Sequence, residues 1–145
     1  MRIAAGSDHA GFDLKNRLCR FLSGRGHAVE DLGTYSPEST DYPDWAAKVG
    51  HAVAAGQADF GVLVCGTGVG MAMAANKIHG VRAANCNNLF IAGLARAHND
   101  ANIVTLGARE VGPEHAEAIV LTFLETAFED GRHARRIAKI AALES

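Results

Sequence analysis

Apolar and polar positions follow two different spacings along the 145-residue chain, and their alternation predicts a regular order of strands and helices. Short apolar runs have the length of strands at 2–6, 27–33, 60–65, 81–85 and 102–107. Between these runs, apolar residues recur at helical spacing. The pattern predicts helices over 11–25, 43–55, 69–78, 88–97 and 113–129, and a basic amphipathic helix in the tail, about 131–145.

Strands that alternate with helices favour an α/β fold: a three-layer, doubly wound, Rossmann-like parallel sheet of about five strands. The continuously apolar run 60–65 is typical of a strand covered on both faces. No linker or repeat interrupts the pattern, so residues 1–145 are expected to form one domain. Ligands of such folds bind at the carboxyl ends of the strands, where Asp8, His9, Cys65 and Arg109 fall.

Composition excludes several classes of protein. The net charge of −2 gives no broad basic surface for nucleic acid. No apolar run approaches the roughly 20 residues of a membrane helix, and the first residues lack the core of a signal peptide. The three cysteines are an odd number at wide spacing, which favours a reducing cytoplasm. Neither they nor the seven histidines show metal-ligand spacing, so no metal is expected.

A glycine-rich turn, Gly66–Gly70, follows Cys65 directly. It does not fit a dinucleotide fingerprint or a cysteine-phosphatase loop, because Met71 stands where these need a glycine and an arginine. The Gly-Lys-Ser/Thr of a Walker loop is also missing. Backbone amides at a strand-to-helix turn bind anions and lower the pKa of a thiol. Cys65 is therefore a candidate base or nucleophile, whereas Cys19 and Cys86 are expected to be small buried hydrophobes.

Three further groups have both a functional and a structural interpretation. Asp8 and His9 lie at a strand-to-helix turn, where a helix cap is the alternative. His98 and Asn99 lie between a helix and a strand, where a polar helix stop is the alternative. Arg132 and Arg136 share one helical face, which could simply be solvated. Together these groups indicate a small anionic ligand held by arginines beside an acid/base pair.

The sequence resembles the type B ribose-5-phosphate isomerases, a group related to the galactose-6-phosphate isomerases. The resemblance covers essentially the whole chain and rests on the segments "GSDHAGFDLK", "TDYPDWA", "CGTGVGMAMAANK", "AHNDANI", "LGAR" and "GRHARRI". It implies interconversion of ribose 5-phosphate and ribulose 5-phosphate through an enediolate, without metal or organic cofactor. One branch of the family uses a glutamate base a few positions after a replaced cysteine. Cys65 is present here and residues 71–77 contain no acid, which implies the cysteine branch.

The resemblance also implies roles for individual residues. Cys65 is the implied base and His98 opens the sugar ring, with Asp8 assisting; Thr67 helps the turn amides to stabilise the enediolate. The implied substrate-binding residues are Asp8, His9, Gly66, Thr67, Gly68, Val69, Gly70, Asn99, Arg109, Arg132 and Arg136. His9 and the three arginines would hold the phosphate.

Family members assemble as homodimers, some of which pair into tetramers. The resemblance therefore implies that Cys65 of one chain works with His98 and Asn99 of its neighbour, and that the tail helix packs at the interface. A preference for pentose or hexose phosphates, such as allose or galactose 6-phosphate, stays open. So does a sugar-phosphate-binding protein without turnover.

Overall fold

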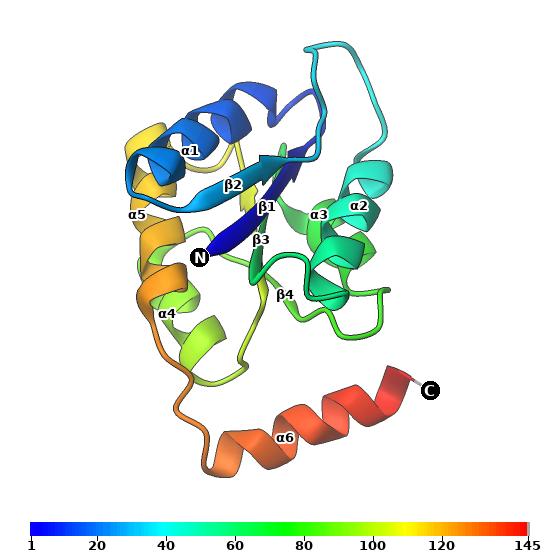
Figure 1. Ribbon diagram of the computed structural model, residues 1–145, viewed down its shortest axis with the longest axis vertical. Coiled ribbons are helices and arrows are strands. Elements are labelled where there is room, and N and C mark those ends of the chain that lie inside the picture. Colours follow the sequence, from blue (N-terminus) through cyan, green and yellow to red (C-terminus); the bar gives the residue numbers. More distant parts are fainter. Residues whose placement is uncertain (145) are drawn as a thin grey trace.

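The protein is built on a five-stranded parallel sheet, seen in the computed structural model of Figure 1, which describes residues 1–144. The strand order is β2-β1-β3-β5-β4. The strands are β1 (Arg2–Ser7), β2 (Ala28–Asp31), β3 (Phe60–Cys65), β4 (Ala83–Asn85) and β5 (Ile103–Gly107), and every paired neighbour is parallel. The predicted doubly wound α/β fold is confirmed.

Five helices cover the two faces of this sheet. They are α1 (Phe12–Gly24), α2 (Tyr42–Ala54), α3 (Val69–Ala75), α4 (Leu89–Ala97) and α5 (Pro113–Glu125). Helices α1, α4 and α5 lie on one face, and α2 and α3 lie on the other, which gives the three predicted layers (Figure 1).

Successive residues of β3 supply both halves of the core, because side chains alternate across a sheet. Val62 and Val64 pack on the α1–α4–α5 side, whereas Leu63 and Cys65 pack on the α2–α3 side. All four are buried, as the continuous apolar run predicted. Cys65 therefore ends the strand with its side chain turned toward α2 and α3.

Some element boundaries differ from those the sequence predicts. Helix α3 ends at Ala75 rather than at residue 78, and β4 has only three residues. The predicted helix 113–129 is wrong beyond Glu125, because Thr126 adopts an extended conformation with ψ 126°. The hydroxyl of Thr126 donates to the carbonyl of Thr122 at 2.6 Å, and the chain runs on without helical structure until Gly131.

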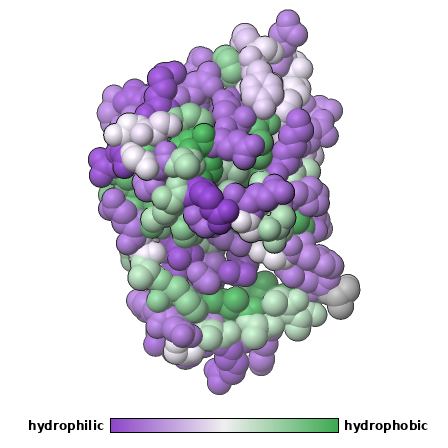
Figure 2. Space-filling view, viewed as in Figure 1, coloured by the Kyte–Doolittle hydropathy of each residue, from purple (hydrophilic) through white to green (hydrophobic). Residues whose placement is uncertain are grey.

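The basic tail forms helix α6 (Arg132–Ala141), followed by a 3₁₀ turn η1 (Ala142–Glu144). The predicted amphipathic helix is confirmed over that range, and Ser145 lies outside the described residues. Helix α6 extends away from the sheet (Figure 1), and its only buried side chain is that of His133. Apolar residues gather along the tail in Figure 2. Ile140 of α6 and Leu143 of η1 are both exposed. None of the helices in residues 1–144 has the length and apolarity to cross a membrane.

Candidate active site

Cys65 lies where the winding of the sheet reverses. The chain leaves β1 toward β2 on one side and leaves β3 toward β5 and β4 on the other. A crevice forms outside the carboxyl ends of strands at such a switch point. Cys65 is the last residue of β3, and Asp8 directly follows Ser7, the last residue of β1. The predicted position of both side chains at this edge of the sheet is confirmed.

Backbone hydrogen bonds hold the turn that follows Cys65. The amide of Gly68 donates to Cys65 Sγ at 3.1 Å. The amides of Ala108 and Arg109, just after β5, donate to the carbonyls of Cys65 and Gly66 at 2.8 and 3.0 Å. One main-chain amide therefore contacts the thiol, and two others hold the backbone that carries it.

Two glycines let the turn approach β5 closely. Gly68 has φ +82°, and a Cβ added there would lie 2.4 Å from Asn85 Oδ1. A Cβ on Gly107 would lie 2.7 Å from the backbone of Thr67. The hydroxyl of Thr105 completes the contact by donating to the Gly68 carbonyl at 2.8 Å. The turn can occupy this position only because neither glycine carries a side chain.

The turn after β1 supplies the acidic side of the crevice. Asp8 is buried, and its Oδ1 accepts the amide of Gly11 at 3.1 Å. The alternative role of Asp8 as a helix cap is thus partly confirmed, because its side chain accepts a backbone amide just before α1. His9 Nδ1 accepts the amide of Thr40 at 3.2 Å, which in the neutral ring leaves the proton on Nε2.

A fully buried lysine supports this turn. Lys15 Nζ lies 2.7 and 2.8 Å from the two carboxylate oxygens of Asp31, and it donates to the carbonyl of Thr34 at 2.7 Å. The amide of Thr34 in turn donates to the carbonyl of Ser7 at 2.8 Å. Lys15 therefore anchors the segment after β2 against the end of β1, next to Asp8.

One pocket of about 410 Å³ collects most of the predicted residues at this edge. Its lining includes Asp8, Cys65, Gly66, Thr67, Val69, Gly70 and Arg109. Tyr42 and Met73, which were not among the predicted site residues, also line it. The Tyr42 ring lies against Gly70, where an added Cβ would come within 2.5 Å of it. Tyr42 is the first residue of α2, distant in sequence from Gly70. Its sequence signal is its place before Pro43 in the segment "TDYPDWA", on which the family resemblance partly rests.

The predicted residues His98 and Asn99 lie at the opposite edge of the sheet. Helix α4 carries the chain back from the end of β4 to the start of β5, and His98 caps that returning end. Cys65 pairs in register with Gly107, at the far end of β5 from Ile103. The four residue steps between Ile103 and Gly107 span about 13 Å. Within one chain, His98 and Asn99 are therefore separated from the thiol by the length of the strand.

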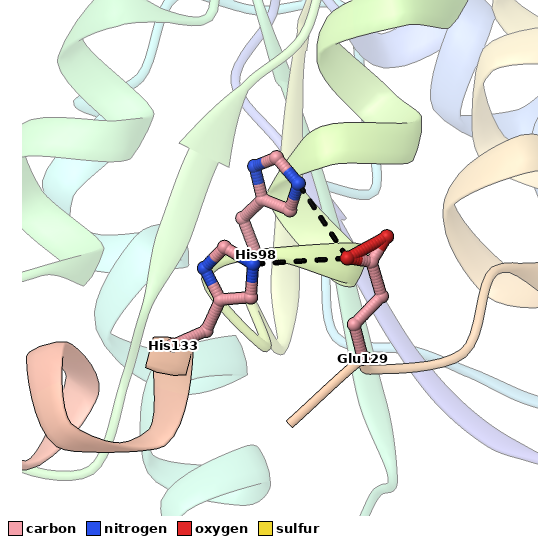
Figure 3. A group of neighbouring side chains, drawn as sticks. All are labelled: His98, Glu129 and His133. Atoms are coloured by element: carbon pink, nitrogen blue, oxygen red, sulfur yellow. Dashed lines mark ion pairs between the residues drawn. The ribbon is translucent and has the colours of Figure 1, made fainter. Parts of the chain in front are cut away.

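His98 belongs to a compact cluster at this second edge. Its ring stacks on that of His133 with centroids 4.2 Å apart, and Nε2 of each ring lies 3.7 Å from Glu129 Oε2 (Figure 3). Burial, followed by the nearby His98 and Arg132, lowers the pKa of His133. Among residues 1–144 this is the one group of three or more potential metal ligands within reach of one another.

This cluster was not predicted, because Glu129 falls within the helix expected over 113–129. The signal was the Asp130–Gly131 pair, since Asp-Gly commonly marks a turn. Both residues have φ of 60°. Arg132 and Arg136 lie on the same tail helix, with exposed side chains.

The other two cysteines lie away from the crevice. Cys86 is fully buried, and burial raises the pKa of its thiol from 9.0 to about 12. Cys19 on α1 is half-buried, and burial, with Asp31 nearby, raises the pKa of its thiol to about 11. The predicted structural role is thus confirmed for Cys86 and only partly for Cys19.

Comparison with known proteins defines the class. The family model for Ribose/Galactose Isomerase matches residues 3–140, so this chain belongs to that family. More particularly, it is 48% identical to ribose-5-phosphate isomerase B of Escherichia coli K12, over 99% of this chain and 96% of that protein. The structure of ribose-5-phosphate isomerase B from Clostridium thermocellum superposes with a TM-score of 0.98 at 50% identity, over 99% and 97% of the two chains. The structure of ribose-5-phosphate isomerase B from Mycoplasma genitalium, with bound ribulose 5-phosphate, superposes with a TM-score of 0.96. The two sequences are 43% identical, and the match covers 99% of this chain and 95% of that one.

Proposed function

We propose that this protein interconverts D-ribose 5-phosphate and D-ribulose 5-phosphate by ring opening and proton transfer through an enediolate. The observation that carries the proposal is the free thiol of Cys65, held by the Gly68 amide in a pocket with Asp8 and Arg109. Membership in an isomerase family with ribose-5-phosphate isomerase B among its relatives supports this substrate.

Cys65 is the proposed base that moves a proton between C1 and C2 of the open sugar. The enediolate oxygens would meet the amides of the turn from Gly66 to Gly70. Thr67 assists, because its Oγ1 accepts the Val69 amide at 3.2 Å and its O–H is left to donate to the substrate. Removal of one such donor typically costs about 3–4 kcal/mol of transition-state stabilisation.

The two separated edges support a dimer with shared sites. A two-fold axis that sets the Cys65 edge of one chain against the His98 edge of its partner would unite all the proposed residues twice. His98 would then donate the proton that opens the ring, with Asp8 assisting and Asn99 binding the sugar. The unpartnered apolar residues of α6 support its place at that interface.

The phosphate is proposed to bind among His9, Arg109, Arg132 and Arg136. Guanidinium groups suit phosphate because their N–H donors match its oxygens in pairs. Anchoring the phosphate away from the reacting carbons lets its binding energy align C1 and C2 with the thiol. Proton transfer of this kind needs no organic cofactor or metal. The free cysteines suit the reducing cytoplasm, which is the proposed location.

Solvent isotope exchange tests this proposal directly. In D₂O, the protein should place deuterium at C2 of ribose 5-phosphate, which NMR detects, because only proton abstraction can introduce it. A sugar-phosphate-binding protein without turnover would leave C2 fully protonated. Assays of ribose, allose and galactose phosphates side by side then measure the substrate preference. A higher kcat/KM for a hexose phosphate would reassign the substrate while leaving the chemistry intact.

A further inference from the structure

The His98–Glu129–His133 cluster has a ligand set that the proposed proton transfer does not use in full. Two imidazoles and one carboxylate with an open fourth position form a common set for Zn²⁺ in proteins. His98 comes from the end of α4, Glu129 from the segment before α6, and His133 from the first turn of α6. The three are therefore held by different parts of the chain.

The main chain brings these three side chains together. The amide of Glu129 donates to the carbonyl of Ala97, the residue before His98, at 3.0 Å. The amide of His133 donates to the carbonyl of Asp130 at 3.2 Å, which fixes the start of α6 close to Glu129. The cluster is thus built by backbone contacts and does not depend on the chance approach of long side chains.

One nitrogen in the cluster is buried without a partner. His133 is 5% exposed, and its Nε2 forms no hydrogen bond within the described part of the chain. Figure 3 shows a nitrogen of each ring turned toward the same carboxylate of Glu129. A buried polar atom without a partner is costly, and a bound cation on the lone pair of Nε2 would remove that cost.

The distances suit a metal ion after a small rearrangement. Ligand atoms at Zn²⁺ bond lengths of about 2.0–2.1 Å lie roughly 3.4 Å apart in a tetrahedral site. The two Nε2–Oε2 distances are 3.7 Å. The rings are 14° from parallel, so the ring of His98 must rotate to direct its lone pair at a shared ion. His98 and Glu129 are 36% and 56% exposed, which leaves room for rotation and access from solvent.

We propose that His98, Glu129 and His133 form an inhibitory site for a divalent transition-metal ion such as Zn²⁺. A metal ion on Nε2 of His98 occupies the lone pair that would carry a proton to the sugar. Turnover therefore stops while the ion is bound. The inhibition, though not the binding, rests on the proposed role of His98. Arg132 and Arg136 repel a cation, and the Glu129 carboxylate offsets part of that charge, which favours reversible binding.

Cobalt provides a probe that does not depend on activity. Co²⁺ added to the purified protein should produce the visible absorption of a low-coordinate cobalt site, and Zn²⁺ should abolish it. Calorimetry should find one Zn²⁺ per chain. Glu129→Gln and His133→Asn should each weaken binding by about tenfold or more. The matched controls Glu125→Gln and His115→Asn, at exposed positions on α5, should bind as the unmodified protein does.

Cys65→Ala tests whether the thiol is the ligand instead, because thiolate sulfur is also a Zn²⁺ ligand in proteins. The proposed site retains its affinity for Zn²⁺ in that variant. Binding that disappears in Cys65→Ala and persists in Glu129→Gln would overturn the inference, because the ion would then sit on sulfur. Unchanged Zn²⁺ affinity in both Glu129→Gln and His133→Asn would overturn it as well.

Kinetics tests the inhibitory part. Zn²⁺ should lower kcat of the unmodified protein, and a chelator should restore it, because the proposed reaction itself needs no metal. Glu129→Gln should keep its basal turnover and resist Zn²⁺. Full turnover in Zn²⁺-saturated protein would overturn inhibition. A metal-free protein that binds Zn²⁺ but never isomerises sugar would instead contradict the proposed function.

Discussion

The two edges of the sheet are built in opposite ways. At the Cys65 edge, the Gly68 amide bonds the buried thiol, amides after β5 bond the carbonyls of Cys65 and Gly66, and the ion pair of buried Lys15 with Asp31 anchors the neighbouring turn. At the His98 edge, the predicted groups are exposed or half-exposed side chains, and two of them belong to a helix with a single buried residue. The proposed base is therefore held by the fold of its own chain, whereas the proposed proton donor His98 and the proposed phosphate ligands Arg132 and Arg136 lie on a surface that a second chain can cover.

Removal of the thiol should have the largest effect. Cys65→Ala should lower kcat by about 10³-fold or more, since it removes the proposed base, while equilibrium binding of substrate persists. Cys65→Ser should be nearly as slow, because a hydroxyl ionises far less readily. The control is Cys19→Ala, outside the pocket. Appreciable kcat in Cys65→Ala would assign the base elsewhere.

Mixing two inactive variants tests whether the edges meet between chains. Equal amounts of Cys65→Ala and His98→Ala, allowed to exchange subunits, should regain about one quarter of the wild-type activity, because half the dimers are hybrids with one intact site of two. If each chain supplied both residues to its own site, every site would carry a lesion and no activity would return. Mass spectrometry of the hybrid confirms that exchange occurred.

His98→Ala should separate ring opening from proton transfer. Consumption of cyclic ribose 5-phosphate should fall by about 10²-fold, a typical contribution of a general acid. Exchange of the C1 proton of ribulose 5-phosphate with D₂O should fall much less, because this sugar has no furanose ring to open. NMR measures both rates, with His115→Ala as control. Equal losses of the two rates would place His98 outside ring opening.

Lys15→Met should test the anchor of the Cys65 edge. The substitution leaves Asp31 without its cation and the Thr34 carbonyl without a donor. The free energy of unfolding in urea should fall by about 2–3 kcal/mol, less than for a fully buried pair because Asp31 is partly exposed. Lys48→Met, at an exposed position, should change it by less than about 0.5 kcal/mol. Equal stability of the two variants would show that the pair contributes nothing net.

The smallest effect concerns Cys86 at high pH. Its folded-state pKa is raised, so its contribution to stability is complete below pH 9 and is lost as pH rises toward about 12. The slope of that loss is about 1.4 kcal/mol per pH unit. Cys86→Ala should therefore flatten the decline of the free energy of unfolding above pH 9, measured by urea titrations. A parallel decline in both proteins would contradict the assignment.

The sequence predicted the Cys65 edge well because its signals are local. A continuous apolar run locates β3, and the end of such a strand must lie at the carboxyl edge of the sheet. Cys65 ends β3, and the glycine-rich turn follows it there. Tyr42 was missed because only the folding of the chain brings the start of α2 to Gly70. Glu129 was missed because the helical pattern of 113–125 continues in sequence, whereas Thr126 and the Asp130–Gly131 turn end it in space. In the proposed dimer, the relation between the two edges depends on a second chain, which the pattern of one sequence does not describe.

The close packing of Gly68 and Gly107 restricts how this gene can vary. A substitution at the first or second base of a glycine codon always introduces a side chain or a stop, whereas every substitution at the third base is silent. Any side chain at these two positions would collide with Asn85 or with the backbone of Thr67. Nearly every missense change at either codon should therefore be eliminated by selection. Both codons can drift only at the third nucleotide. The turn that follows the proposed catalytic Cys65 is therefore inherited almost unchanged.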